Sequence, residues 1–214
     1  MNAAPTVEAA KLRARMVDHQ LRRRGISDRR VLGAMEAVPR EAFVPAHLTK
    51  HAYDDAALAI GEGQTISQPY IVAEMCSLLE LEGTERVLDV GTGSGYAAAV
   101  LDALAADVIS IERVEALAVR ARTALEETGH ASVEVRLGDG RLGVPDRAPF
   151  DAIAVAAATE RVPPALYGQL AVGGRLVLPR GGPRGQRLVT VVRTEDGPVE
   201  TVSLGCRFVP LVGG

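Results

Sequence analysis

Apolar residues recur at helical spacing in the first third of the chain, which predicts two amphipathic helices. The first begins near Thr6 and ends at Gly25, because glycine is typical of the position after a helix C-terminus. The second follows Ser27 and Asp28, which can cap its N-terminus, and ends at Pro39. Both should pack their apolar faces on the rest of the molecule. These faces consist of Leu12, Met16, Val17 and Leu21 in the first helix and Val31, Leu32, Met35 and Val38 in the second.

Between Arg40 and Gln68 the periodicity fails, and turn residues alternate with isolated apolar residues. A loop of this length inside a compact domain is usually functional. It leads into an amphipathic helix in which Pro69 is the first residue and Ser67 or Gln68 is the N-cap. The loop is therefore predicted to form part of a binding site that the start of this helix faces.

From Gly83 onward, short apolar runs alternate with helical stripes, as in βαβ units with parallel strands. The last two runs are separated by a turn sequence and predict an antiparallel pair. The predicted fold is one α/β domain with a doubly wound, mostly parallel sheet and an antiparallel edge. In this domain, residues 1–82 supply helices and a substrate loop that pack on an α/β core of residues 83–214. The predicted strands are 86–90, 108–112, 132–137, 150–155, 175–178, 188–193 and 199–208.

Three glycines at alternate positions, Gly91, Gly93 and Gly95, follow the first of these strands. Such a turn lets backbone N–H groups approach a ligand closely at the start of a helix. A dinucleotide-binding turn has a further glycine where this chain has Tyr96, which argues against NAD. A glycine-rich turn without any ligand stays an open alternative for this motif alone.

Acidic residues lie near the ends of the first three predicted strands. Asp89 precedes the glycine turn, and Glu112 ends the second strand, where a carboxylate can bind ribose hydroxyls. Asp139 lies between Gly138 and Gly140 after the third strand, where it can accept a hydrogen bond from an adenine amino group. An exposed turn is the alternative for this short motif. Together the acids predict a ligand that carries adenosine at the carboxyl edge of the sheet.

Composition narrows the classes of function. The 214 residues are 47% hydrophobic and carry a formal net charge of −3, so nucleic acid is not an expected partner. We expect neither a signal peptide nor a membrane span. Cys76 and Cys206 lie in apolar segments without metal-ligand spacing, which predicts free thiols in a cytoplasmic protein. The four histidines also lack ligand spacing, so no metal site is expected.

Blocks of sequence distributed along the chain carry a further signal; they span residues 16–26, 38–45, 63–70, 89–96, 110–113, 138–140, 148–153, 173–177 and 208–211. Through them the chain resembles the protein-L-isoaspartate O-methyltransferases over nearly its full length. The block of residues 63–70, GQTISQPY, is specific to that family, whereas the glycine turn is shared by methyltransferases of many kinds. The resemblance implies the doubly wound fold of S-adenosylmethionine-dependent methyltransferases.

The resemblance also implies a reaction, in which a methyl group passes from S-adenosylmethionine to the free carboxylate of an L-isoaspartyl residue in a damaged protein or peptide. The ester then collapses to a succinimide, which can hydrolyse back to aspartate. The acceptor is already ionised at neutral pH and the donor is a sulfonium, so neither a general base nor a metal is required. We expect catalysis mainly through positioning, by a monomer whose partners are isoaspartyl proteins or peptides.

By the same resemblance, Ser67 is the catalytic residue, and its hydroxyl and the N–H groups at the helix start can donate hydrogen bonds to the acceptor carboxylate. An ordinary helix N-cap is its alternative role. Glu112 would bind the ribose, Asp139 the adenine and Asp89 the methionine part, while Val209 would close over the peptide. The implied cofactor-binding residues are Thr65, Ile66, Asp89, Gly91, Gly93, Ser94, Gly95, Glu112, Asp139 and Gly140, and the implied substrate-binding residues are Thr65, Ile66, Ser67 and Val209.

Two alternatives to general repair stay open. The same chemistry could act on one dedicated peptide and install an aspartimide, or the chain could be a non-catalytic module that binds an adenosine ligand. The intact block around Ser67 counts against the second alternative. The chain departs from the common family pattern at Ala57 and Ala59, where prolines often stand, and at Ala156. These departures bear on loop stiffness and peptide preference.

Overall fold

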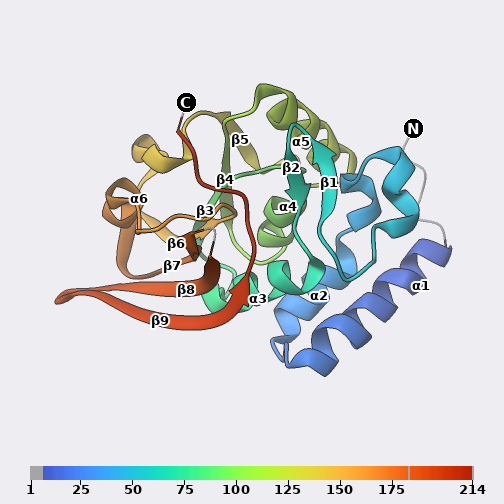
Figure 1. Ribbon diagram of the computed structural model, residues 1–214, viewed down its shortest axis with the longest axis horizontal. Coiled ribbons are helices and arrows are strands. Elements are labelled where there is room, and N and C mark those ends of the chain that lie inside the picture. The colour runs from blue at the N-terminus through green and yellow to red at the C-terminus, as the bar shows by residue number, and fades with distance from the viewer. Residues whose placement is uncertain (1–6, 183, 214) are drawn as a thin grey trace.

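The computed structural model describes residues 7–182 and 184–213, and a seven-stranded sheet runs through its centre (Figure 1). The predicted helix start at Thr6 lies outside the described residues. The strand order is β5-β4-β3-β6-β7-β8-β9. The strands are β3 (Arg86–Val90), β4 (Asp107–Glu112), β5 (Glu134–Leu137), β6 (Phe150–Val155), β7 (Leu170–Gly182), β8 (Gly185–Thr194) and β9 (Gly197–Cys206).

The strands from β5 to β7 run parallel, and β8 and β9 add an antiparallel edge. The chain moves outward from β3 to β5, returns to β6 beside β3, and then moves outward on the other side. This reversal of strand order confirms the predicted doubly wound sheet. Ligands of such sheets bind outside the carboxyl ends of the strands at the reversal. The topology therefore directs attention to the ends of β3, β4 and β6.

Strand β7 is longer than the predicted strand 175–178, because it begins at Leu170 and continues to Gly182. Its first residues pair with β6 through an irregular register, and Gly173 there has a φ of +84°. Its last residues pair with β8 as far as Gly182 opposite Gly185. Glycines and charged residues interrupt the apolar run at both ends, so the hydrophobic pattern revealed only the middle of this strand.

Two apolar layers cover the two faces of the sheet. Val87 of β3 belongs to a core shared with the helices α1 to α5, whereas Leu88 and Val90 belong to a core shared with α6. This alternation follows from the side-chain period of a strand. The connecting helices are α3 (Pro69–Leu79), α4 (Tyr96–Asp102), α5 (Glu115–Glu127) and α6 (Pro164–Gln169).

Both predicted N-terminal helices are confirmed. The first ends at Gly25, which adopts a φ of +101°. Its second half is a π-helical turn followed by a 3₁₀ turn, which the apolar spacing did not reveal. The carboxylate of Asp28 caps the second helix and accepts hydrogen bonds from the N–H groups of Arg30, at 2.8 Å, and Val31, at 3.3 Å. The elements are α1 (Val7–Met16), η1 (Val17–Leu21), η2 (Arg22–Arg24) and α2 (Arg29–Ala37).

The segment predicted as a long loop, 40–68, contains regular structure, so this expectation was wrong. Two 3₁₀-helices precede a small antiparallel hairpin. The hairpin turn is built from Gly61, Glu62 and Gly63, which all have positive φ. Strands of three and four residues are too short to leave a recognisable period in the sequence. The elements are η3 (Arg40–Phe43), η4 (Ala46–His51), β1 (Leu58–Gly61) and β2 (Gln64–Ile66).

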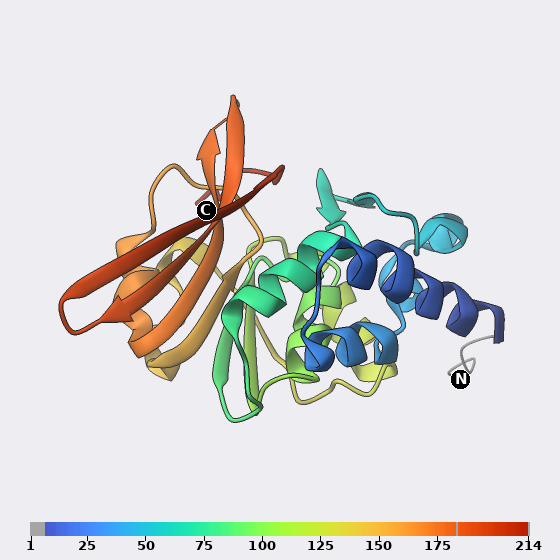
Figure 2. The same ribbon diagram turned by 90° about the horizontal axis from the view of Figure 1, so that it is seen from below.

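The N-terminal elements pack on the sheet through a continuous apolar core, in which Met16, Met35 and Ile71 join Val87. Figure 2 shows the N-terminal helices in blue at the opposite end of the molecule from the β8–β9 hairpin in orange and red. The continuity of this core supports the predicted single domain, which stays a prediction. Within residues 7–182 and 184–213, no helix is long and apolar enough to cross a bilayer.

Candidate active site

The turn between β3 and α4 places its three glycines in the left-handed region of backbone conformation. The φ angle is +95° at Gly91, +54° at Gly93 and +90° at Gly95. Other residues rarely adopt these angles, which explains why glycine occupies alternate positions. The N–H of Gly91 donates to the carbonyl oxygen of Ile111 at 2.9 Å, so the turn is anchored to β4.

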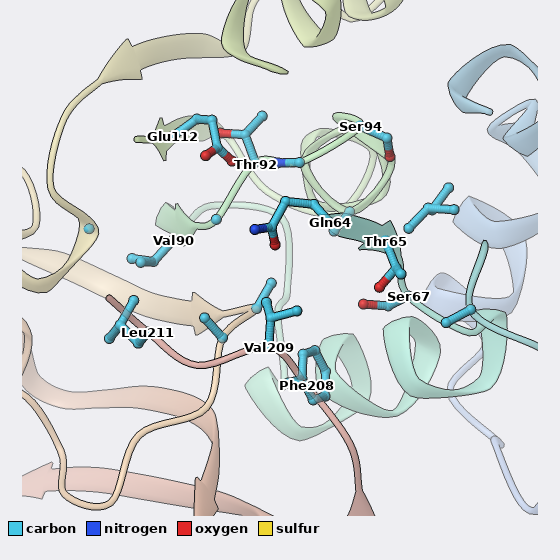
Figure 3. A pocket seen from close by; sticks show the side chains of 18 of the residues that line it. Gln64, Thr65, Ser67, Val90, Thr92, Ser94, Glu112, Phe208, Val209 and Leu211 are labelled. Atoms are coloured by element: carbon cyan, nitrogen blue, oxygen red, sulfur yellow. Dashed lines mark hydrogen bonds between the residues drawn. The ribbon is translucent and has the colours of Figure 1, made fainter. Parts of the chain in front are cut away.

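A pocket of about 290 Å³ lies at this edge of the sheet (Figure 3). Glu112, Val90 and Leu211 lie on one side of it, and Thr65 and Ser67 lie on the other. Segments far apart in the sequence meet here. The main contributions come from residues 64–68 before α3, 90–94 of the glycine turn, 111–113 at the end of β4, 156–157 after β6, and 207–212, which we call the C-terminal segment.

The Glu112 carboxylate is held rigidly in the pocket wall, and its residue is only 6% exposed. One oxygen, Oε2, accepts a hydrogen bond from the N–H of Gly93 at 2.9 Å. The other, Oε1, accepts from the N–H groups of Arg113, at 2.8 Å, and Val114, at 2.9 Å. A carboxylate can accept about four hydrogen bonds, so Glu112 keeps acceptor capacity for a hydroxyl in the pocket.

The wall beside Glu112 is apolar and is formed by Val90, Ile111 and Leu211, with Gly140 among them. A Cβ atom on residue 140 would lie 2.6 Å from Cγ1 of Val90, so only glycine fits. This wall suits a flat ring. The neighbouring Asp139 does not line the pocket, because its carboxylate caps η5 (Gly140–Leu142) and pairs with Arg141 at 2.7 Å.

On the opposite side, the helix α3 begins without a side-chain cap. Gln68 occupies the N-cap position, but its side-chain amide donates to the Asp55 carboxylate at 2.7 Å instead. The N-cap role considered for Ser67 is therefore wrong. The N–H groups of Ile71 and Val72 donate to the Gln68 carbonyl oxygen, and the Ser67 hydroxyl lies at the pocket on this side.

Asp89 lies beneath the glycine turn and outside the pocket wall, with 1% of its surface exposed. The Ser110 hydroxyl donates to its Oδ2 at 2.7 Å, and Thr92, which does line the pocket, contacts Ser110 in turn. Its Oδ1 atom is buried without a partner in the described structure. Burial raises the pKa of Asp89 to about 6 against the opposing hydrogen bond from Ser110, and the charge of Glu112 adds to the rise.

Ser94 and Gly95 show how the turn leads into α4. The Ser94 hydroxyl accepts a hydrogen bond from the N–H of Tyr96 at 3.3 Å, although Ser94 also lines the pocket. Gly95 does not line it. A Cβ atom there would lie 3.4 Å from Ala121 and Leu125 of α5, so Gly95 allows two helices to pack closely.

The C-terminal segment closes the lower side of the pocket in Figure 3, where Phe208, Val209 and Leu211 lie. Its backbone is fixed to Ala158 after β6, because Ala158 donates to the Val209 carbonyl at 2.8 Å and accepts from the Leu211 N–H at 2.7 Å. The Gln186 side-chain amide holds the main chain of Phe208 in the same way. Its oxygen accepts from the Phe208 N–H at 2.6 Å, and its NH₂ group donates to the Phe208 carbonyl oxygen at 3.1 Å.

Sequence reasoning missed several residues of the pocket wall, including Val90, Thr92, Ile111 and Phe208. Val90 and Ile111 are strand-end residues beside the glycine turn, so their position was a usable signal. Phe208 reaches the pocket only through the path of the C-terminal segment, which no local pattern reveals. In the described part of the chain, no group of three or more His, Cys, Asp or Glu residues could hold a metal ion.

Comparison with known proteins agrees with this geometry. The sequence model of the family described as Protein-L-isoaspartate(D-aspartate) O-methyltransferase (PCMT) matches residues 12–214. A protein-L-isoaspartate O-methyltransferase 2 of Marinobacter nauticus is 57% identical over 208 residues, which cover 96% of this chain and 95% of the relative. A protein-L-isoaspartate O-methyltransferase of Koribacter versatilis is 53% identical over 215 residues, which cover 100% and 96%.

The chain belongs to the protein-L-isoaspartate O-methyltransferase family.

Solved structures of this family share the fold. One protein-L-isoaspartate O-methyltransferase superposes with a TM-score of 0.85 at 30% identity, over 94% of this chain and 66% of that longer chain. A Plasmodium falciparum structure described as a member of the family, in complex with S-adenosyl-L-homocysteine, has a TM-score of 0.83 at 24% identity, over 94% and 99%. The second likeness supports the fold alone. The family resemblance and the fold predicted from the sequence are thus confirmed.

Most site residues implied by the family resemblance line the pocket; they are Thr65, Ile66, Ser67, Gly91, Gly93, Ser94, Glu112, Gly140 and Val209. Asp89, Gly95 and Asp139 do not line it. For these three, the structure shows roles in holding the glycine turn, packing α4 on α5 and capping η5. The contacts of all these residues with cofactor or peptide stay predictions.

The raised pKa of Asp89 predicts a specific dependence of stability on pH. Between its ordinary pKa of 3.8 and about 6, the folded protein keeps a proton that the unfolded chain has lost. The contribution of Asp89 to stability should therefore fall as pH rises through this range. Relative to Asp89→Asn, the wild-type free energy of unfolding should decrease by about 2–3 kcal/mol between about pH 4 and pH 7 in denaturant titrations.

Asp196, which is exposed in the turn before β9, supplies the control for that measurement. Asp196→Asn should give a pH profile parallel to that of the wild type. If the unfolding free energies of wild type and Asp89→Asn changed in parallel with pH, Asp89 would have the same pKa in the folded and the unfolded protein.

Proposed function

We propose that this chain transfers a methyl group from S-adenosylmethionine to the free carboxylate of L-isoaspartyl residues in damaged proteins or peptides, which starts repair through a succinimide. One observation carries the proposal. Ser67, from the block specific to the family, and Glu112, beside the glycine turn, line opposite sides of one pocket (Figure 3). Membership in the family supports the same reaction, because its relatives are named for it.

The pocket fits the cofactor in two respects. The apolar side chains of Val90, Ile111 and Leu211 form a wall against which an adenine ring can pack, and the fixed carboxylate of Glu112 can accept a hydrogen bond from a ribose hydroxyl. When bound, S-adenosylmethionine supplies an electrophilic methyl group on a positively charged sulfur. The remaining work of the protein is to hold an acceptor oxygen in line with that group, and such positioning can supply several kcal/mol of barrier lowering.

Ser67 is the residue that we assign to the acceptor. A carboxylate is ionised at neutral pH, so the protein needs no base to activate it. It needs a hydrogen-bond donor that orients the carboxylate without neutralising it. The Ser67 hydroxyl lies on the side of the pocket opposite Glu112 and can make this bond. Val209 lines the lower side of the pocket in Figure 3, and we expect it to cover the bound peptide.

We infer that the protein acts as a monomer in the cytoplasm, on isoaspartyl proteins or peptides rather than nucleic acid or a membrane. Cys76 is buried and Cys206 half-buried, and both are free thiols, as suits a reducing compartment. The net charge of −3 supports the absence of a nucleic-acid partner.

The reaction is tested by incubating the protein with radiolabelled S-adenosylmethionine and two peptides that differ only in an isoaspartyl or an aspartyl linkage. The isoaspartyl peptide should incorporate label as a base-labile methyl ester, and the aspartyl peptide should not. Varying the residues that flank the isoaspartyl linkage should leave turnover detectable. Methylation of a single sequence alone would indicate a dedicated peptide substrate, and methylation of neither peptide would indicate a module that only binds its ligand.

Replacing the hydroxyl tests the assignment of Ser67. Ser67→Ala removes a hydrogen bond to a charged group, so turnover of the isoaspartyl peptide should fall about tenfold or more. Ser132→Ala is the matched control, because the Ser132 hydroxyl donates to Asp102 and lies outside the pocket wall. Wild-type turnover in Ser67→Ala would contradict the assignment.

Glu112→Gln tests the ribose site. The amide removes the charge and replaces one acceptor oxygen with a donor that opposes the N–H groups of the turn, so the dissociation constant for S-adenosylhomocysteine should rise about tenfold. Titration calorimetry measures this change, and Glu115→Gln, at the exposed start of α5, is the control. Equal affinities for wild type and Glu112→Gln would exclude Glu112 from the site.

A further inference from the structure

Arg40, in η3, is fully buried, with 0% of its surface exposed. In the described part of the chain it pairs with no carboxylate. Its Nε donates to the Ala52 carbonyl oxygen at 2.7 Å, and its Nη2 donates to the Ser67 carbonyl oxygen at 2.7 Å. The centre of the Tyr96 ring lies 4.8 Å from the guanidinium carbon. Burial lowers the pKa of Arg40 to about 10, so the group stays charged at neutral pH.

A charge in this position is unfavourable for stability. An ion that leaves water loses several kcal/mol of hydration, and it recovers that loss only through an opposite charge or a full set of hydrogen bonds. Arg40 has neither, because its Nη1 is buried without a partner among the described residues. The contacts that Arg40 does make with two carbonyl oxygens and the Tyr96 ring therefore offset only part of the loss, which raises the question of what this side chain does beyond packing.

Two of the three contacts of Arg40, those with Ser67 and Tyr96, reach residues of separate segments that line the pocket. Ser67 belongs to the substrate side, and Tyr96 is the first residue of α4, directly after the glycine turn. Both residues line the pocket. Ala52 ends the segment that carries η4. Arg40 thus fixes the main chain at Ser67 relative to the turn beside Glu112.

We propose that Arg40 is a positioning residue for methyl transfer, which holds the Ser67 main chain so that the Ser67 hydroxyl keeps its alignment with the cofactor side of the pocket. The inference rests on the proposed function, because it concerns the same acceptor. An in-line transfer is sensitive to displacement of its reacting groups by about 1 Å. The rigid fork of the guanidinium suits this task, since its donors reach two carbonyl groups at once.

Arg40→Lys tests the proposal, because lysine keeps the charge but cannot bridge both carbonyl groups. With the isoaspartyl peptide, kcat should fall about tenfold, while KM and the dissociation constant for S-adenosylhomocysteine change by less than about threefold. Arg30→Lys, at an exposed arginine, is the control for the loss of a two-carbonyl bridge and should keep the wild-type kcat. Arg30 also bridges two carbonyl groups, those of Glu82 at 2.6 Å and Leu104 at 3.0 Å, but at the opposite edge of the sheet.

A double-mutant cycle with Ser67→Ala separates positioning from a general loss of structure. If Arg40 acts through the Ser67 hydroxyl, Arg40→Lys should lower kcat by less than about twofold in the Ser67→Ala background. Equal effects in both backgrounds would overturn the proposal, because a purely structural defect does not depend on that hydroxyl. Rates are normalised to the fraction of protein that binds S-adenosylhomocysteine, so partial unfolding does not imitate the result.

Arg40→Gln, which removes the buried charge and keeps one donor group, replaces Arg40→Lys in both measurements if the lysine variant does not fold. An unchanged kcat in the folded variant would overturn the role of Arg40 while the wild type still methylates the peptide. A wild type without activity on the isoaspartyl peptide would instead overturn the proposed function, and the role of Arg40 with it.

Discussion

The left-handed turn after β3 is the constraint on which the pocket depends. Gly91, Gly93 and Gly95 all have positive φ, and the turn is tied to the end of β4 through the hydrogen bond from Gly91 to Ile111. Because the turn is this tight, the Gly93 N–H reaches the Glu112 carboxylate, and the first residues of α4, Tyr96 and Ala97, line the pocket. A side chain at any of these positions would open the turn and move both the carboxylate and the helix.

Three buried ionisable side chains near this turn are stabilised by different kinds of partner. Glu112 accepts three backbone N–H groups at the pocket wall and so stays fixed for a ligand. Asp89, below it, has one hydroxyl partner, and its pKa rises to about 6. Arg40 is held by carbonyl dipoles and an aromatic ring. The first arrangement suits binding, and the last links the Ser67 main chain to the first residue of α4.

The pocket is completed by segments from both ends of the chain. The hairpin β1–β2 brings Thr65 and Ser67 to one side, and the C-terminal segment brings Val209 and Leu211 to another. Each is held by polar contacts to distant residues. Arg40 holds Ser67, and Gln186 with Ala158 holds the C-terminal segment. The central sheet thus supplies the wall around Glu112, and the added elements enclose the rest of the pocket.

The sequence by itself determined the central sheet, the capped helix after Asp28 and the glycine turn. Each depends on a local cause, namely an apolar run in a strand, a carboxylate beside free N–H groups, or an angle that only glycine tolerates. Ser67 was predicted from the family resemblance alone, and its role stays a prediction. Local patterns failed for the hairpin β1–β2, whose strands are too short for a period.

Only the tertiary structure decided which of the acidic residues reach the pocket. Asp89 shares the face of β3 with Val87, so it points below the turn, while Asp139 is drawn into the cap of η5. Likewise, Arg40 and Ser67 are 27 residues apart, and nothing in either local pattern predicts their hydrogen bond. Burial, the sheet face that each strand residue occupies and the contacts between distant residues depend on how the whole chain packs. A local sequence pattern carries no information about them.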